Sequence, residues 1–188
     1  ILIEAYRGYA EVGLYQAAYK LLFGFQLLRV FHMAMFPRLA SLYAAGNILE
    51  YGRVMRTSLF LSLIALIPIG IMTAFFPREI IGLIFGQHYV SASIALPFLI
   101  WSGILSFIAG FFTYTLIIAG HQKSWLLLEF LALIILIIIE VALIPRLGFF
   151  GAAIATFTGE VVFLFLIVIG VYSNRKLRII FFSDHKER

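Results

Sequence analysis

Long apolar runs without a single charged residue restrict the fold of this 188-residue chain more than any other feature. Residues 57–77 and 89–122 form uncharged stretches of 21 and 34 residues. A bilayer core about 30 Å thick is crossed by about 20 apolar residues in helical form. Open strands cannot cross it, because lipid offers no partner to an unpaired backbone amide. These runs therefore predict membrane-spanning helices.

The full set of apolar segments predicts an all-α polytopic membrane protein with about five transmembrane helices. We expect the first segment to stop at Pro37 and the fourth at Pro145, because proline lacks the amide that a continuing helix needs. Residues 1–11 are interpreted as the end of a preceding helix with an outer loop, and 173–188 as a basic tail. The transmembrane region, 12–172, has predicted spans at about 13–36, 57–77, 94–118, 124–144 and 149–172.

The composition agrees with this class and excludes several others. Apolar residues make up 63% of the chain and charged residues 12%, about half the charge of an ordinary soluble domain. A cytosolic enzyme, a disordered tail and a nucleic-acid-binding domain are therefore excluded. The chain has no Cys, which rules out disulfides and thiolate chemistry. It begins with Ile1 and shows no signal-peptide pattern, so we expect a fragment of a longer protein.

The positions of the basic residues in the loops predict the orientation of the helices. One side of the predicted topology carries nine of the 14 Lys and Arg residues and the other carries three. The nine are Arg38, Arg53, Arg56, Lys123, Arg175, Lys176, Arg178, Lys186 and Arg188, and the three are Arg7, Arg78 and Arg146. Basic loops favour the cytoplasmic side, which predicts a multi-pass protein of the cytoplasmic membrane with a cytoplasmic C-terminus. The basic tail is interpreted as a topology signal that also contacts lipid headgroups.

The first predicted span carries two cations, Lys20 and Arg29. A charge inside a bilayer is costly and usually faces a bundle interior or a wet cavity, although both side chains can also reach toward opposite interfaces. At 100° per residue, Arg29 shares an arc about 80° wide with Tyr15, Tyr19 and Gln26, and Lys20 lies on an adjoining strip. This broad polar and aromatic face predicts a helix beside a water-filled cavity.

Three acids lie inside the later spans. Glu129 and Glu140 are close to three helical turns apart and share a face. Glu160 lies at the middle of the last span and follows a ladder of small residues, Gly151, Ala155 and Gly159, that is typical of close helix packing. Each acid is either a functional residue of a polar interior or a structural residue with a buried hydrogen bond.

No motif for catalysis or cofactor binding occurs in the sequence. Glycine-rich phosphate loops, His-Glu-x-x-His and Gly-x-Ser-x-Gly are all absent, and the loops are too short for a catalytic domain. His88 and His121 lie in predicted loops without a second ligand nearby, so we expect no metal site. The segments at Asn47 and at Gln87 are interpreted as turns. We therefore expect a protein that is not an enzyme and needs no cofactor.

Four sequence blocks together resemble the polysaccharide biosynthesis flippases of the multidrug/oligosaccharidyl-lipid/polysaccharide exporter superfamily. They are 12–20 (VGLYQAAYK), 35–40 (MFPRLA), 84–89 (IFGQHY) and 143–156 (LIPRLGFFGAAIAT). The resemblance covers about residues 5 to 175 and implies a two-lobed exporter fold of which this chain is the C-terminal lobe. One departure is Glu140, where members of this family often carry Asn. An acid there argues against a purely cationic cavity, and it either pairs with a cation of the N-terminal lobe or couples the transport cycle to protons. In such a transporter, Glu129 and Glu160 would likewise be coupling or structural acids.

The resemblance also implies a function. Such proteins flip polyprenyl-diphosphate-linked oligosaccharides across the cytoplasmic membrane by alternating access, for O-antigen (lipopolysaccharide), capsule or exopolysaccharide assembly. The implied partners are this lipid-linked substrate, the missing N-terminal lobe, membrane lipids and glycan polymerase machinery. Lys20 and Arg29 would then line a cationic cavity for the diphosphate, helped by Tyr15, Tyr19 and Gln26. Three alternatives remain open: a multidrug or peptidoglycan-lipid exporter of the same fold, a membrane-embedded glycan polymerase or ligase, and a purely structural packing subunit.

Overall fold

The chain folds into a bundle of helices, and no strand occurs among the described residues of the computed structural model, which are 2–26, 29–174 and 177. The elements are α1 (Leu2–Arg7), α2 (Tyr9–Gln26), α3 (Arg29–Ala44), α4 (Ile48–Phe75), α5 (Pro77–Phe85), the 3₁₀ helix η1 (Gln87–Ile94), α6 (Leu96–Ile118) and α7 (Gln122–Ser173). Three of them, α4, α6 and α7, are long and apolar enough to cross a membrane. The prediction of an all-α membrane protein is thereby confirmed.

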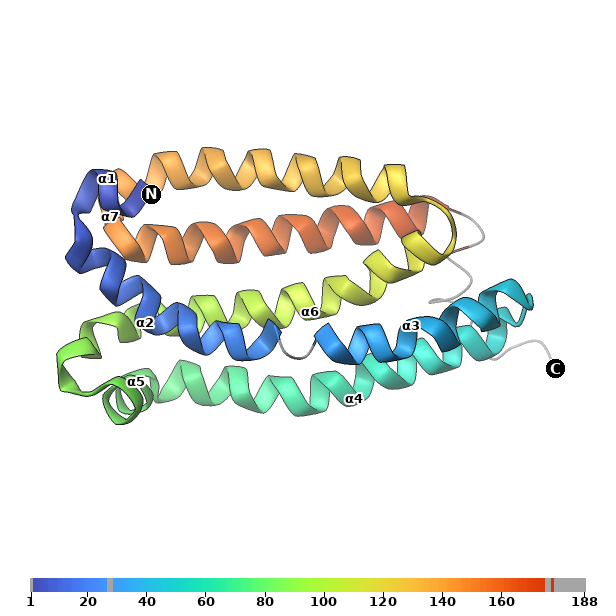
Figure 1. The fold of residues 1–188 in the computed structure, drawn as a ribbon, viewed down its shortest axis with the longest axis horizontal. Coiled ribbons are helices and arrows are strands. Elements are labelled where there is room, and N and C mark those ends of the chain that lie inside the picture. The colour runs from blue at the N-terminus through green and yellow to red at the C-terminus, as the bar shows by residue number, and fades with distance from the viewer. Residues whose placement is uncertain (1, 27–28, 175–176, 178–188) are drawn as a thin grey trace.

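The long helices run side by side along the bundle (Figure 1). α2 and α3 follow one another along the bundle, and the first predicted span, 13–36, falls on these two helices, with residues 27–28 outside the described residues. The predicted span 57–77 falls mostly within α4, and 94–118 nearly coincides with α6. Both remaining segments, 124–144 and 149–172, lie within the 52 residues of α7.

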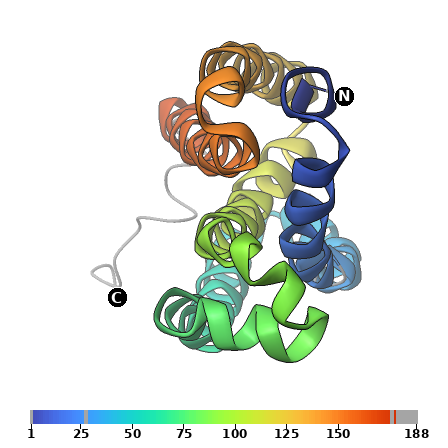
Figure 2. The same cartoon turned by 90° about the vertical axis from the view of Figure 1, so that its left-hand side faces the viewer.

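α7 passes along the bundle twice because its backbone reverses at Gly148. The φ and ψ angles there are 60° and −138°, a non-helical conformation that side chains other than glycine rarely adopt. Figure 2 shows the two passes lying next to one another at one side of the bundle. Gly159 faces Leu136 of the first pass, where an added Cβ would lie 3.1 Å from the leucine Cδ1. The small-residue ladder therefore packs one pass of α7 against the other, as its spacing predicted.

Two predicted helix ends are wrong, both at proline. α3 continues through Pro37 to Ala44, and the first pass of α7 continues past Pro145 to the reversal at Gly148. A proline removes one backbone hydrogen bond, and a helix packed in a membrane protein tolerates that loss when neighbouring groups compensate. The first pass ends instead where glycine permits a backbone conformation that no helix can continue.

Side chains of α1 and α2 form hydrogen bonds with the backbone on both sides of the α7 reversal. Arg7, at the end of α1, donates hydrogen bonds from Nη2 to the carbonyl oxygens of Pro145 (2.9 Å) and Arg146 (2.6 Å). Glu11, in the first turn of α2, accepts a hydrogen bond through Oε2 from the Phe149 amide at 2.9 Å. A cation at the carbonyl end of one pass and an anion at the amide end of the next both complement the helix dipoles. This cluster, the Arg7–Glu11 clamp, fixes how the two passes meet.

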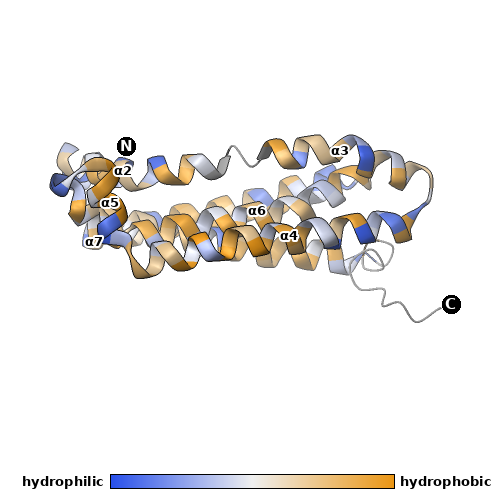
Figure 3. Cartoon of the chain, turned by 90° about the horizontal axis from the view of Figure 1, so that it is seen from below, coloured by the Kyte–Doolittle hydropathy of each residue, from blue (hydrophilic) through white to orange (hydrophobic). Residues whose placement is uncertain are grey.

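α6 lies at the centre of the bundle, packed against α4, α7, α2 and α3. Tyr51 of α4 is fully buried against it and donates a hydrogen bond to Thr115 Oγ1 at 3.1 Å. Many large side chains of α4 and α7 are apolar and exposed, and Figure 3 shows most of the α4 ribbon in orange, the hydrophobic end of the scale. This distribution suits helices that face lipid on the outside and bury polar groups within.

The loop predicted at Asn47 is a turn that caps the next helix. Gly46 has a φ of 72°, and Asn47 Oδ1 accepts a hydrogen bond from the Glu50 amide at 3.2 Å. The segment from Gln87, also interpreted as a turn, forms the 3₁₀ helix η1 instead.

Candidate functional site

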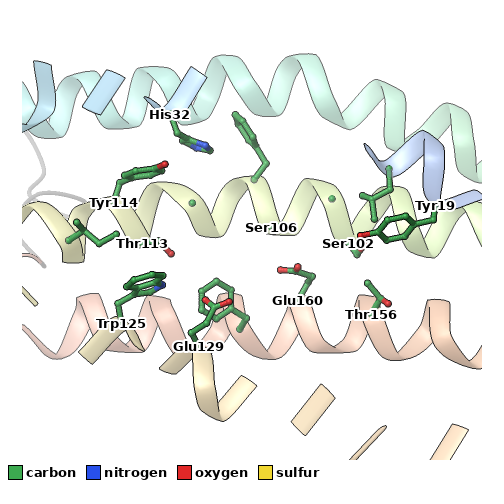
Figure 4. Close-up of a pocket in the computed structure, with 16 residues that line it drawn as sticks. Tyr19, His32, Ser102, Ser106, Thr113, Tyr114, Trp125, Glu129, Thr156 and Glu160 are labelled. Carbon is green, nitrogen blue, oxygen red and sulfur yellow. The ribbon is translucent and has the colours of Figure 1, made fainter. Parts of the chain in front are cut away.

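A polar cavity of about 480 Å³ lies between α6 and both passes of α7, bordered by α2 and α3. Its volume falls within the range of about 300–1,000 Å³ that is usual for small-molecule sites. Figure 4 shows polar side chains from α6 and α7 facing one another across it. The lining residues are Tyr19, Leu22, His32, Ser102, Gly103, Ser106, Phe107, Gly110, Thr113, Tyr114, Ile117, Trp125, Glu129, Thr156, Glu160 and Phe163.

The cavity exists because α6 presents small residues on one face. Ser102, Ser106, Gly110 and Thr113 recur at intervals of three or four residues, so they follow one another along a single helix face. Gly110 also permits a close approach, since an added Cβ would lie 2.8 Å from Cε1 of His32. Small side chains on the central helix leave the space that larger apolar residues would fill.

Two carboxylates face this space, one from each pass of α7. Glu129 belongs to the first pass and Glu160 to the second, and both are labelled on the α7 side of Figure 4. Among the described residues, no Lys or Arg lines the cavity. The reversal at Gly148 is what brings these two acids to the same cavity, because it returns the chain alongside itself.

Hydroxyl groups add further oxygen atoms to the wall. Ser102 Oγ donates to the Leu99 carbonyl at 2.7 Å, and Thr156 Oγ1 donates to the Ala152 carbonyl at 2.9 Å. A hydroxyl whose hydrogen is used in this way keeps its oxygen lone pairs as acceptors. The wall is therefore rich in hydrogen-bond acceptors.

Aromatic rings stand at both ends of the cavity (Figure 4). At one end Tyr19 stacks on Tyr15, with ring centroids 5.6 Å apart. At the other end Tyr114 stacks on the buried His32 at 5.5 Å, near Trp125. The Trp125 Nε1 atom is buried and has no hydrogen-bond partner among the described residues.

The structure brings some of the predicted site residues together and leaves others apart. Tyr19, Glu129 and Glu160 line the cavity, and the Tyr15 hydroxyl lies 3.3 Å from Oγ1 of Thr156, which is itself a lining residue. Three of the described residues are not among the lining residues: Tyr15 and Glu140, which are half-buried, and Lys20, which is exposed. The side chains of Gln26 and Arg29 lie outside the description, as do the basic residues of the tail, Arg175, Lys176, Arg178, Lys186 and Arg188.

Sequence reasoning missed three parts of the site: His32, Trp125 and the small-residue face of α6. The sequence carried a recognisable signal for two of these parts, His32 and the small-residue face of α6. His32 is an ionisable residue within the first predicted span, and the spacing of Ser102, Ser106 and Gly110 in an otherwise bulky helix marks a hollow face. Among the described residues, no group of three or more His, Asp or Glu side chains could hold a metal ion.

Two curated proteins are similar to this chain. A capsular polysaccharide biosynthesis protein of Staphylococcus aureus, CapF, is 26% identical over 156 residues, covering 82% of this chain and 39% of the relative. An uncharacterized membrane protein of Methanocaldococcus jannaschii is 33% identical over 133 residues, covering 66% of this chain and 25% of the relative.

The chain thus spans between a quarter and two fifths of the length of these relatives. No family model matches the chain, and no solved structure matches it significantly. The similarities and the apolar helices together support a membrane protein with a distant relationship to polysaccharide biosynthesis.

Proposed function

We propose that this chain is one lobe of a transporter that moves a polyprenyl-diphosphate-linked oligosaccharide across the cytoplasmic membrane. The observation that carries the proposal is a cavity of about 480 Å³, lined by polar and aromatic side chains, between helices whose outer faces are apolar. A polar chamber among lipid-facing helices is what a carrier of a hydrophilic cargo needs. The distant similarity to a capsular polysaccharide biosynthesis protein supports a glycan as that cargo.

The arrangement of the loops supports the proposed orientation. Arg38, Arg53, Arg56 and Lys123 belong to the helix ends near the Gly46 and Gly120 turns, at one end of the bundle (Figure 1). The Arg7–Glu11 clamp, α5 and the Gly148 reversal lie at the opposite end. The positive-inside rule then puts the first end in the cytoplasm.

Alternating access would need a second set of helices across the cavity from this lobe, which is the N-terminal lobe that the family resemblance implies. The other proposed partners are membrane lipids and the polymerase machinery that consumes the exported glycan. In this scheme the protein performs no covalent chemistry and needs no cofactor.

A gene deletion tests the proposal. Cells without the gene should lose surface glycan, measured by lectin binding, and accumulate the lipid-linked oligosaccharide, measured by mass spectrometry of lipid extracts. Wild-type protein should restore display. Lys20→Ala and Arg29→Ala should each fail to restore it at normal membrane levels, if these cations contact the diphosphate during the cycle. Unchanged surface glycan in the deletion strain would reject the proposal.

A second candidate function is export of organic cations, since carboxylates and aromatic rings together also attract cationic drugs. Glu129, Glu160 and Trp125 provide these groups here. Under this alternative, the deletion strain would become more sensitive to cationic dyes while its surface glycan stayed normal.

A further inference from the structure

The short helix α5 carries the most exposed large apolar side chain among the described residues. Leu83 is 89% exposed, and Ile84 beside it is also exposed. Phe75 and Phe76, just before α5, are exposed as well, so these residues form a group rather than a single apolar side chain. None of them lines the cavity, so the candidate site does not account for their exposure. A contiguous exposed apolar patch is typical of a surface that binds a partner or a membrane.

The break between α4 and α5 places α5 across the bundle. α4 ends at Phe75, and Pro77 begins α5, because a proline has no amide to donate back into α4 but fits the first turn of a new helix. Figure 1 shows α5 almost end-on while α4 extends along the bundle, and Figure 2 shows α5 lying across the end of the bundle. A helix with this direction at the end of a membrane span lies along the membrane surface.

The residues of α5 divide its surface into three sectors, at 100° per residue. One sector faces the bundle, where Ile81 is fully buried and Phe85 packs against the core. A second sector is polar and exposed, and it carries Arg78 and Glu79. The third sector is apolar and consists of Ile80, Leu83 and Ile84. A helix with one polar and one apolar outer face is typical of a membrane interface.

The apolar sector lies where the lipid-facing surface of α4 ends. The uncharged part of α4, residues 57–75, is about 28 Å long at about 1.5 Å per residue, close to the about 30 Å of a bilayer core. The last turn of α4 therefore lies at the boundary between acyl chains and headgroups. Met72, Phe75 and Phe76 are exposed there and lead directly into α5. The molecules beside an apolar surface at this level are lipids.

We propose that α5 is an interfacial helix whose apolar sector binds lipid in the leaflet at this end of the bundle. Leu83 and Ile84 lie among the upper acyl chains, and Arg78 and Glu79 lie among the headgroups. Because these two charges offset one another, burial of the apolar sector drives the binding, and anionic lipid is not required. This inference goes beyond the proposed transport function and does not depend on the cargo.

Site-directed spin labelling measures the depth of α5 directly. The chain has no Cys, so one introduced Cys carries the only nitroxide label. The protein is reconstituted in phosphatidylcholine vesicles, and collisions of the label with oxygen, which concentrates in lipid, and with a water-soluble nickel chelate give its depth. The label of Leu83→Cys should lie about 5–10 Å below the phosphates. Ile84→Cys, in the same sector, replaces this variant if Leu83→Cys elutes as an aggregate in size-exclusion chromatography.

Two further variants calibrate the depth. Arg78→Cys, in the polar sector of the same helix, is the matched control, and its label should lie at or above the phosphates. Ile64→Cys, exposed in the middle of α4, is the lipid reference, and its label should lie deeper than both. The depth of the Leu83→Cys label should stay the same in vesicles of equal parts phosphatidylcholine and phosphatidylglycerol, because the net charge of the polar sector is zero.

Three results would overturn the inference. Equal exposure of the Leu83→Cys and Arg78→Cys labels to the nickel chelate would mean that the apolar sector lies in water. A Leu83→Cys label shielded from both reagents would mean that protein covers this sector. Insertion in the anionic vesicles alone would mean that charge, rather than the apolar sector, holds the helix at the membrane. The deletion experiment tests transport alone, so either proposal can fail without the other.

Discussion

Replacing Gly148 by alanine tests whether the reversal of α7 depends on glycine and on Glu11. The backbone there has a φ of 60° and a ψ of −138°, and holding a residue other than glycine in such a region costs about 1–3 kcal/mol. The new Cβ would also lie 2.7 Å from Cδ and 2.9 Å from Oε1 of Glu11. The flexible carboxylate would have to move away.

Moving the carboxylate breaks the 2.9 Å hydrogen bond that Glu11 accepts from the Phe149 amide. Losing a hydrogen bond to a charged group costs about 1.5–3 kcal/mol. Together with the backbone contribution, Gly148→Ala should lower the free energy of unfolding by about 2.5–6 kcal/mol. That is a large share of the about 5–15 kcal/mol that stabilises a typical domain.

A double-mutant cycle separates the two contributions. In a Glu11→Ala background the carboxylate is absent, so Gly148→Ala should cost only the backbone contribution of about 1–3 kcal/mol. Unfolding is followed by tryptophan fluorescence during titration of mixed micelles with sodium dodecyl sulfate. Gly13→Ala is the matched control, because Gly13 is helical with nothing within 4 Å of an added Cβ, and it should be neutral or slightly stabilising.

Two results would refute this reasoning. A cost below about 1 kcal/mol in the wild-type background would mean that the chain does not reverse through a glycine-only conformation at this position. An equal cost in both backgrounds would mean that Glu11 does not contact the reversal.

Three further changes should have measurable effects on stability in the same micelle titration. Gly110→Ala places a Cβ 2.8 Å from His32 Cε1 and should destabilise the bundle by about 1–3 kcal/mol through overpacking; a cost near zero would contradict the close approach of α3 to α6. Arg7→Ala removes the donor to the two carbonyls that end the first pass of α7 and should cost about 1–2 kcal/mol, with Arg7→Lys intermediate. Tyr51→Phe deletes the buried 3.1 Å hydrogen bond to Thr115 and should cost about 0.5–1.5 kcal/mol, and an increase in stability would contradict that bond.

The hydropathy of the sequence predicted α4 and α6 well, because a helix that crosses lipid must be apolar over its whole length. The apolar run at 94–118 nearly coincides with α6, and 57–77 lies mostly within α4. Helix ends were predicted less well, because Pro37 lies inside α3. Proline weakens a helix by a local cost that tertiary packing can offset, whereas the apolar length needed to cross lipid cannot be offset.

The candidate site could be predicted only in part. Glu129 and Glu160 stood out in the sequence as acids inside apolar spans, and both line the cavity. Tyr19 and Lys20 also stood out, yet only Tyr19 lines the cavity. Neighbouring residues on a helix point about 100° apart, so the rotation of α2 against α6 decides which of the two faces inward.

By itself, the sequence determined that this chain is an all-α membrane protein, because a segment in contact with lipid must be apolar and must pair its backbone amides within a helix. Only the tertiary structure decided that α7 turns back at Gly148 rather than at Pro145 and that Glu129 and Glu160 meet at one cavity. It also decided that the described wall of this cavity carries carboxylates and no Lys or Arg. These outcomes depend on contacts between residues far apart in the chain, such as the Arg7–Glu11 clamp on the reversal, which no local pattern encodes.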